Sequence, residues 1–421
     1  MQTDRRILPP SKGPQMRRAV TAALVSLAVL AGSAAIAPPA SAVVIDDTSF
    51  GMHVPNVSTG GDPDVNYGAI RLWDSGVSWG LVQQTAKKYW WNGLDASIAN
   101  SNKEGASSLY VLGSTPKWAA KNPKQGTYPN KGAASMPASS KIWKDWVTSV
   151  VKRYHSSIDA YQIWNEANLS TFWQGTPDEM ADLTKQAFTI IRKYDPTAKV
   201  VAASSTARLT SAFNKFFPAY LKGLKKRGWP VDVFAVHLYP AGTGTPATRA
   251  GYITTVQAAL AKAGAPARPL WDTEINYGLA GPGSVPHVSI VGDDAAAWVS
   301  QTYLDNVRLG VQRAYWYYWY APTALLGINM LTGSAPAIGY QNTYNWLVGG
   351  DVNCSTAAVN ICSINKAGVI STVAWATTGS GTFTVPDGAT VQTTAAGVTT
   401  PVVGGTQVTI GSMPTWFGAA S

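Results

Sequence analysis

The sequence predicts an α/β protein: an eight-stranded parallel (β/α)8 barrel, or TIM barrel, followed by a small C-terminal antiparallel β-sandwich domain. Two observations lead to this fold class. Between about residues 50 and 340, short β-branched or aromatic runs alternate with longer amphipathic stretches, as repeated βα units do. Beyond residue 347, Thr, Val and Gly dominate and charge almost vanishes, which is typical of short antiparallel strands.

Eight runs in the first region have the composition of strands, and the stretches between them have the periodicity of helices. The predicted strands are 51–54, 69–72, 108–112, 160–164, 200–203, 233–237, 269–273 and 314–319. The predicted helices are 96–102, 142–155, 176–194, 212–227, 250–263 and 294–310. Thr176-Pro177-Asp178-Glu179 has the cap, proline and acidic residues of a helix start. Together the units approach the roughly 250 residues of a typical barrel.

In the C-terminal region, alternating runs at 368–375, 381–385 and 406–410 are separated by turn residues such as Pro386-Asp387-Gly388. Cys354 and Cys362 are the only cysteines, and we expect a disulfide between them. The predicted division is a signal peptide at 1–42, a catalytic barrel at 43–345 and a β-sandwich at 346–421.

The first 42 residues read as an export signal. Arginines including Arg17 and Arg18 precede an apolar run at 19–30, and Ala40-Ser41-Ala42 matches a signal-peptidase site. A twin-arginine signal is the alternative, and a general secretory signal is favoured. We therefore expect a secreted protein, extracellular or in the cell envelope. No later apolar stretch reaches the ~18 residues of a membrane span, so no membrane anchor is predicted in the mature chain.

The charge and the histidine content argue against nucleic-acid binding and against metal-dependent catalysis. The net charge is +10, and residues 1–42 contribute +4 (five Lys and Arg, one Asp), which leaves +6 for the remainder. This diffuse charge, with Lys225-Lys226-Arg227 as the only basic block, predicts no nucleic-acid partner. The four histidines are scattered, so neither a catalytic metal nor a cofactor is expected. The sequence does not predict an oligomeric state.

Glutamate is rare, and two of the four glutamates follow predicted strands directly. Glu166 follows the fourth strand and Glu274 the seventh. In a barrel of this kind, the carboxyl ends of the strands form the catalytic face. Glycoside hydrolysis needs two carboxylates that face each other, and a separation of about 5 to 5.5 Å leads to retention of configuration.

Three short motifs in the predicted barrel resemble motifs of a known group of enzymes. Trp164-Asn165-Glu166-Ala167-Asn168, Val236-His237-Leu238-Tyr239-Pro240 and Trp271-Asp272-Thr273-Glu274 resemble the strand 4, 6 and 7 motifs of clan A glycoside hydrolases, with glycoside hydrolase family 39 and secreted bacterial relatives the most similar. The resemblance covers residues 50–340. It implies a glycosidase that acts on O-glycosidic bonds of a poly- or oligosaccharide, with Glu166 as acid/base, Glu274 as nucleophile and Asn165 bonded to the substrate 2-hydroxyl. Family members usually have proline where Ala167 stands.

The resemblance also implies supporting residues. Arg71 resembles the arginine that keeps the nucleophile ionised. His237 and Tyr239 resemble the pair that hydrogen-bonds the carboxylates, and Trp319 or Trp316 resembles the tryptophan under the sugar. The acid/base needs a raised pKa, for which aromatic walls around Glu166 are expected.

Two further candidates come from position alone: His53 ends the first strand, and Trp118 lies in a loop over the barrel mouth. Core packing is about as plausible for Trp118. Two alternative functions share these residues, namely a carbohydrate-binding protein on a degenerate barrel and a transglycosylase. The sugar, the linkage and endo or exo action are not predicted.

Overall fold

The computed structural model describes residues 42–281, 283–320 and 325–420, all of which belong to one compact unit, Pro39–Ser421. The predicted signal peptide, except for Ala42, lies outside the described residues. None of the helices in these ranges combines the length and the apolar character that a membrane crossing needs.

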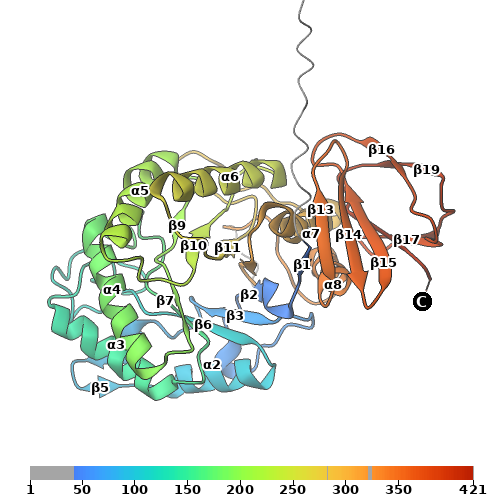
Figure 1. The fold of residues 1–421 in the computed structure, drawn as a ribbon. Coiled ribbons are helices and arrows are strands. Elements are labelled where there is room, and N and C mark those ends of the chain that lie inside the picture. The colour runs from blue at the N-terminus through green and yellow to red at the C-terminus, as the bar shows by residue number, and fades with distance from the viewer. Residues whose placement is uncertain (1–41, 282, 321–324, 421) are drawn as a thin grey trace, which may run out of the picture. The chain divides into compact units, whose positions relative to one another are not determined.

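A parallel sheet with the order β8-β7-β6-β3-β2-β12-β11-β10-β9 forms the barrel (Figure 1). The two ends of this order, β8 and β9, are consecutive pieces of one strand position: Val201 bridges to Val233, and Ser205 pairs with Val236 on the same neighbour. The sheet therefore closes on itself with eight strand positions, as predicted. Its strands are β2 (Phe50–Met52), β3 (Ala69–Leu72), β6 (Ser107–Val111), β7 (Ala160–Gln162), β8 (Lys199–Val201), β9 (Ser205–Thr206), β10 (Phe234–His237), β11 (Leu270–Ile275) and β12 (Arg313–Trp316).

Helices lie on the outer side of this sheet (Figure 1). They are α1 (Trp79–Val82), α2 (Asn92–Lys103), α3 (Ser140–Tyr154), α4 (Pro177–Tyr194), α5 (Thr210–Lys226), α6 (Pro246–Ala263), α7 (Gly292–Leu309) and α8 (Ala335–Leu347), with 3-10 turns at Asp47–Ser49 and Val57–Thr59 and a small hairpin of β4 (Gln83–Thr85) and β5 (Lys88–Tyr89). The predicted start of α4 is confirmed, because Thr176 and Glu179 form a reciprocal capping box. Helix α8 was not predicted, since Pro336, Gly339 and the lack of charged residues hide its periodicity.

Most strand ends differ from the prediction by one to three residues, and two of these differences change the carboxyl end of the barrel. β12 ends at Trp316 instead of residue 319, and β11 continues to Ile275, so Glu274 lies within the strand and not after it. The pairing of β10 with β11 also shifts, since Val236 is opposite Asp272 and His237 is opposite Glu274. One extra residue on β11, Thr273, makes this a β-bulge, a feature that re-aims side chains near active sites.

The barrel interior changes from apolar to polar along the strands. One apolar cluster contains Ala69, Ala160, Ala235 and Trp271, each on a different strand. Because alternate residues of a strand share a face, the next inward side chains toward the carboxyl ends are Arg71, Gln162, His237 and Thr273. Polar groups therefore gather at the end where a barrel enzyme has its active site.

The C-terminal region is a sandwich of a seven-stranded sheet, in the order β1-β13-β14-β15-β20-β17-β18, and a two-stranded sheet of β16 and β19. Phe383 of the small sheet packs on Phe417 of the large one with ring centroids 5.0 Å apart. The predicted disulfide is confirmed, joining Cys354 and Cys362 at opposite positions of β13 and β14. The strands are β1 (Val43–Val44), β13 (Asp351–Ser355), β14 (Asn360–Lys366), β15 (Val369–Trp375), β16 (Gly381–Thr384), β17 (Val391–Thr394), β18 (Thr399–Pro401), β19 (Gln407–Ile410) and β20 (Thr415–Gly418).

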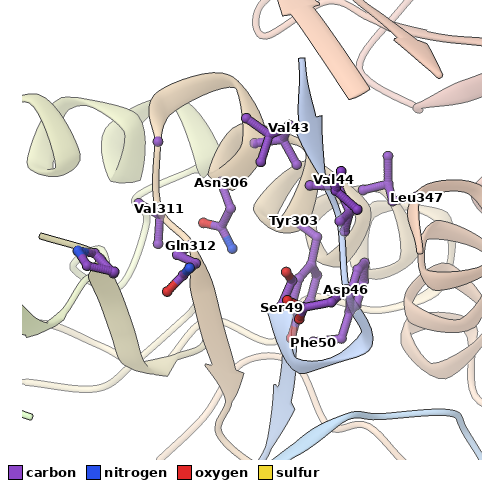
Figure 2. Close-up of a pocket in the computed structure, with 14 residues that line it drawn as sticks. Val43, Val44, Asp46, Ser49, Phe50, Tyr303, Asn306, Val311, Gln312 and Leu347 are labelled. Carbon is purple, nitrogen blue, oxygen red and sulfur yellow. The ribbon is translucent and has the colours of Figure 1, made fainter. Parts of the chain in front are cut away.

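Strand β1 ties the chain's start to this sheet, because Val43 pairs with Val352. A cavity of about 280 Å³ lies beside β1 (Figure 2). Its lining includes Phe50 at the start of β2 and Gln312 just before β12, so it is at the amino-terminal ends of the strands. In barrels of this kind that end serves stability, whereas the carboxyl ends of the strands carry the active site.

Candidate active site

Glu166 and Glu274 meet at the carboxyl end of the barrel. One oxygen of each carboxylate and one nitrogen of His237 all lie within 4.8 Å of one another. Both side chains are nearly buried, with 12% of Glu166 and 8% of Glu274 exposed. Glu166 has φ of +38°, a left-handed conformation that costs a non-glycine residue energy and is frequent at functional sites. Its N–H donates to Ser204 Oγ at 2.9 Å, which helps to hold this conformation.

His237 bridges the two carboxylates. Its Nδ1 lies 3.1 Å from Glu166 Oε1 and 3.3 Å from Glu274 Oε2. Burial lowers the pKa of His237 to about 3, although the charge of Glu274 opposes this shift. The imidazole is therefore neutral at pH 7, and its Nδ1–H is a donor for an ionised carboxylate.

Arg71 connects the nucleophile candidate with the strand that precedes the acid/base candidate. Its Nη1 donates to Glu274 Oε1 at 2.5 Å, its Nη2 to Asn165 Oδ1 at 2.8 Å and its Nε to Gln162 Oε1 at 2.7 Å. The whole side chain is buried. Three bonded acceptors fix the guanidinium plane, so its charge is directed at one oxygen of Glu274.

Glu274 has a second donor, since Tyr239 Oη donates to its Oε2 at 3.0 Å. The residue before Glu274, Thr273, is also held by hydrogen bonds. His53 Nε2 donates to the carbonyl of Thr273 at 3.0 Å, and Gln162 Nε2 donates to Thr273 Oγ1 at 3.2 Å. The bulge residue Thr273 is thus anchored through both its main chain and its side chain, which orients the next residue, Glu274.

Burial dominates the protonation of both carboxylates. It raises the pKa of Glu166 to about 7, while the charges of Arg208 and Arg71 oppose this shift. Burial also raises the pKa of Glu274, while the neighbouring His237 and the charge of Arg71 oppose this shift. The two carboxylates share His237, but Glu274 also accepts hydrogen bonds from Arg71 and Tyr239. These two donors favour the ionised form of Glu274.

A third carboxylate, Asp74, was not predicted. It follows β3 with φ of +59° and accepts hydrogen bonds from the hydroxyls of Tyr128 and Tyr317, the latter at 2.6 Å. Its charge raises the pKa of both Glu166 and Glu274. The sequence signal was its position two residues after the strand that carries Arg71.

The remaining predicted residues lie in different surroundings. His53 is buried and bonded to the carbonyl of Thr273, with its ring 4.9 Å from that of Tyr317. Trp316 is fully buried in the main core and lies near Tyr277, whereas Trp319 is 4% exposed and follows β12. Trp118 Nε1 donates to the carbonyl of Gln83, in a pocket separate from the two carboxylates.

Glu166, His237 and Glu274 also form the one group of potential metal ligands found within residues 42–281, 283–320 and 325–420. A cation there would compete with Arg71, which already places positive charge 2.5 Å from Glu274. The arrangement of two carboxylates, a bridging imidazole and a buried guanidinium instead matches the needs of acid/base and nucleophilic chemistry at a glycosidic carbon.

The fold and this site define a barrel glycosidase, and the comparisons agree. Residues 82–326, more than half of the chain, match the family model "glycosyl hydrolase catalytic core", and the chain belongs to this family. The matched segment contains Glu166, His237 and Glu274, whereas Arg71 precedes it. The predicted glycosidase class and carbohydrate substrate are thereby confirmed.

Solved structures share the fold at low sequence identity. A family 39 glycoside hydrolase from Bacteroides cellulosilyticus WH2 is 16% identical with a TM-score of 0.66, covering 90% of this chain and 83% of its own. A family 39 enzyme from Xanthomonas axonopodis pv. citri is 15% identical with a TM-score of 0.63, covering 92% and 99%. A family 44 endoglucanase from Clostridium thermocellum is 13% identical with a TM-score of 0.56, covering 89% and 97%. No curated protein matches the chain.

Proposed function

We propose that this glycosidase is a secreted retaining enzyme in which Glu166 is the acid/base and Glu274 the nucleophile. The observation that carries this proposal is the distance of at most 4.8 Å between oxygens of the two carboxylates. Retaining enzymes have carboxyl groups about 5 to 5.5 Å apart, whereas inverting enzymes need about 6.5 to 9.5 Å to admit a water molecule.

The reaction has two displacements. In the first, Glu274 attacks the anomeric carbon while the bond to the leaving oxygen breaks, and Glu166 transfers its proton to that oxygen. In the second, Glu166 removes a proton from water, water attacks the anomeric carbon, and the bond to Glu274 breaks. Each displacement inverts the anomeric centre, so the product retains the configuration of the substrate.

The surroundings of the carboxylates support this assignment of roles. An acid must hold a proton at the start, and Glu166 has a pKa of about 7. A nucleophile must be ionised, and Glu274 is paired with Arg71 and Tyr239. Arg71 also donates a hydrogen bond to the side-chain oxygen of Asn165, so the amide nitrogen of Asn165 remains as a donor for a sugar hydroxyl.

Secretion is part of the proposal. It is supported by the signal-like residues 1–42, with Val43 as the mature start, and by the disulfide between Cys354 and Cys362, a bond typical of oxidising compartments. We also propose residues 43–345 as the catalytic domain and 346–421 as a second domain, whose contribution is to stabilise the barrel.

The first test is the release of reducing ends from a panel of plant and bacterial envelope polysaccharides. Wild type is compared with Glu166→Ala and Glu274→Ala, and Glu104→Ala, a surface glutamate, serves as the control. We expect both site variants to lose activity and azide to restore Glu274→Ala, with a glycosyl azide of inverted configuration as the product. An inverted sugar product from the wild type would refute retention, and binding of a glycan without any cleavage would favour a carbohydrate-binding protein.

A further inference from the structure

A second pocket on the catalytic end of the barrel is lined by positive and aromatic side chains. It has a volume of about 510 Å³, within the range of ligand sites, and its lining includes Gln84, Pro116, Lys117, Trp118, Asn130 and Lys131. These residues come from the connections that follow β3 and β6, two neighbouring strands of the barrel.

The same two connections also approach the catalytic carboxylates. Asp74, in the connection after β3, accepts a hydrogen bond from Tyr128, in the connection after β6. Tyr128 precedes the pocket residues Asn130 and Lys131 by two and three positions. The two connections that line the pocket therefore also contribute to the surroundings of the catalytic carboxylates, because Asp74 acts on both Glu166 and Glu274.

The charged side chains that line the pocket are all positive among the residues that the structure describes. Residues 113–139 contain four lysines and no acidic residue. Lys117 and Lys131 are both exposed, and no acidic side chain lines the pocket among the residues that the structure describes. The pocket therefore attracts an anionic sugar.

The pocket is also preorganised. Trp118 is fixed through its indole N–H, which donates to the carbonyl of Gln83 at 3.0 Å. Asn130 Nδ2 donates to the carbonyls of Thr115 and Lys131. Gly132, with φ of +88°, packs so closely that a Cβ there would be 3.2 Å from Lys117 Cα. A fixed aromatic ring beside two cations offers both a stacking face and charge to a sugar.

From these observations we infer that the pocket is a distal subsite for an acidic sugar unit, with Trp118 as the stacking platform and Lys117 and Lys131 as partners of its carboxylate. The inference rests on the proposed function, since it names the class of substrate, an acidic polysaccharide. The unit that is cleaved lies at Glu166 and Glu274, and the acidic unit lies farther along the chain.

The test uses polymers that differ only in charge. Glucuronoxylan, polygalacturonate and hyaluronan are each compared with their carboxyl-reduced forms, in which every uronic acid is a neutral hexose. Binding is measured by affinity electrophoresis in the full-length Glu274→Ala background, so that no polymer is cut. The variants are Lys117→Gln/Lys131→Gln, Trp118→Ala and, as a matched control of equal charge from the same loop, Lys121→Gln/Lys124→Gln.

We expect Glu274→Ala to bind at least one native polymer more tightly than its reduced form. Lys117→Gln/Lys131→Gln should weaken binding of that native polymer about fivefold, the scale of two partly exposed ion pairs, and should remove most of its salt dependence. Trp118→Ala should weaken binding of both forms, and the control pair should change neither. Equal binding of native and reduced forms, no binding of any polymer, or an undiminished preference in Lys117→Gln/Lys131→Gln would overturn the inference. Hydrolysis of aryl glycosides by the wild type, which needs only the reacting centre, tests the proposed function separately.

Discussion

The guanidinium of Arg71 lies 2.5 Å from the carboxylate of Glu274, and both groups are buried. The charge of Arg71 favours the ionised form of Glu274 and opposes the effect of burial, which raises the pKa of this carboxyl. In Arg71→Met, the pKa of Glu274 should therefore rise further, and kcat/KM should fall by about 10²- to 10³-fold, the range for loss of one aligned donor in an active site.

The pH profile of kcat/KM checks this prediction. A nucleophile must be ionised, so activity is lost as pH falls through the pKa of Glu274, and Arg71→Met should move this acid limb to higher pH. Arg71→Lys keeps the charge but not the planar fork that also bonds Gln162 and Asn165, so its loss should be smaller. An acid limb at the same pH in Arg71→Met would show that Arg71 does not control the charge of Glu274.

The alkaline limb of the pH profile of kcat/KM should reflect the loss of the proton from Glu166. Burial raises its pKa to about 7, and the acid role requires the protonated form, so kcat/KM should fall as pH rises through about 7. In Glu166→Gln this limb should disappear for a dinitrophenyl glycoside, whose leaving group needs no proton. Persistence of the limb in Glu166→Gln would assign it to another group.

Substitution of Asp74 should move the alkaline limb of the pH profile of kcat/KM while both glutamates stay in place. Its negative charge raises the pKa of Glu166, so Asp74→Asn should lower this pKa and shift the alkaline limb to lower pH. Tyr128→Phe serves as the matched control, because it removes a hydrogen bond to Asp74 and keeps the charge. Equal shifts in Asp74→Asn and Tyr128→Phe would point to a change in loop position instead of charge.

Much of this site could be predicted because its residues stand at strand ends with recognisable neighbours. Glu166 follows the short strand β7. Arg71 and His237 each stand two positions after an inward-facing alanine, and this alternation of inward residues along a strand can be seen in the sequence. The partners that complete the site were harder to foresee. Gln162 and Asp74 are ordinary polar residues until the barrel closes and places β3 and β7 on either side of β6.

The orientation of Glu274 could not be predicted from the pattern. Inward residues alternate along β11, so Trp271 and Thr273 point inward and Glu274 would point outward in a regular strand. The bulge between β10 and β11 reverses this. A bulge depends on the pairing of two strands whose partner residues are 36 or 37 positions apart in the sequence, such as Val236 with Asp272 and His237 with Glu274, and it leaves no local sequence signal.

Asp272 and Arg249 hold this bulge from the outer side. Arg249 Nη2 donates to Asp272 Oδ2 at 2.7 Å, and Asp272 Oδ1 accepts the N–H of Leu238 at 3.1 Å, between His237 and Tyr239. Both charged side chains are buried, so Asp272→Ala leaves an unpaired buried charge and should reduce the free energy of unfolding by about 3 to 5 kcal/mol.

Denaturant unfolding of Asp272→Ala, Arg249→Leu and the double variant measures this pair. The double variant should lose less stability than the two single variants together, because it leaves no charge uncompensated. A loss below about 1 kcal/mol in Asp272→Ala would mean that water reaches the pair.

The disulfide should contribute stability and leave catalysis unchanged. Cys354 and Cys362 are eight positions apart on paired strands of the sandwich, away from Glu166 and Glu274. Closure of so short a loop in the unfolded chain corresponds to about 2.5 kcal/mol. Cys354→Ser/Cys362→Ser should therefore unfold at lower denaturant concentration with kcat within about twofold of wild type. Wild type treated with a reductant should behave like the double variant, and a matching loss of kcat would instead indicate that the sandwich acts on the geometry of the barrel.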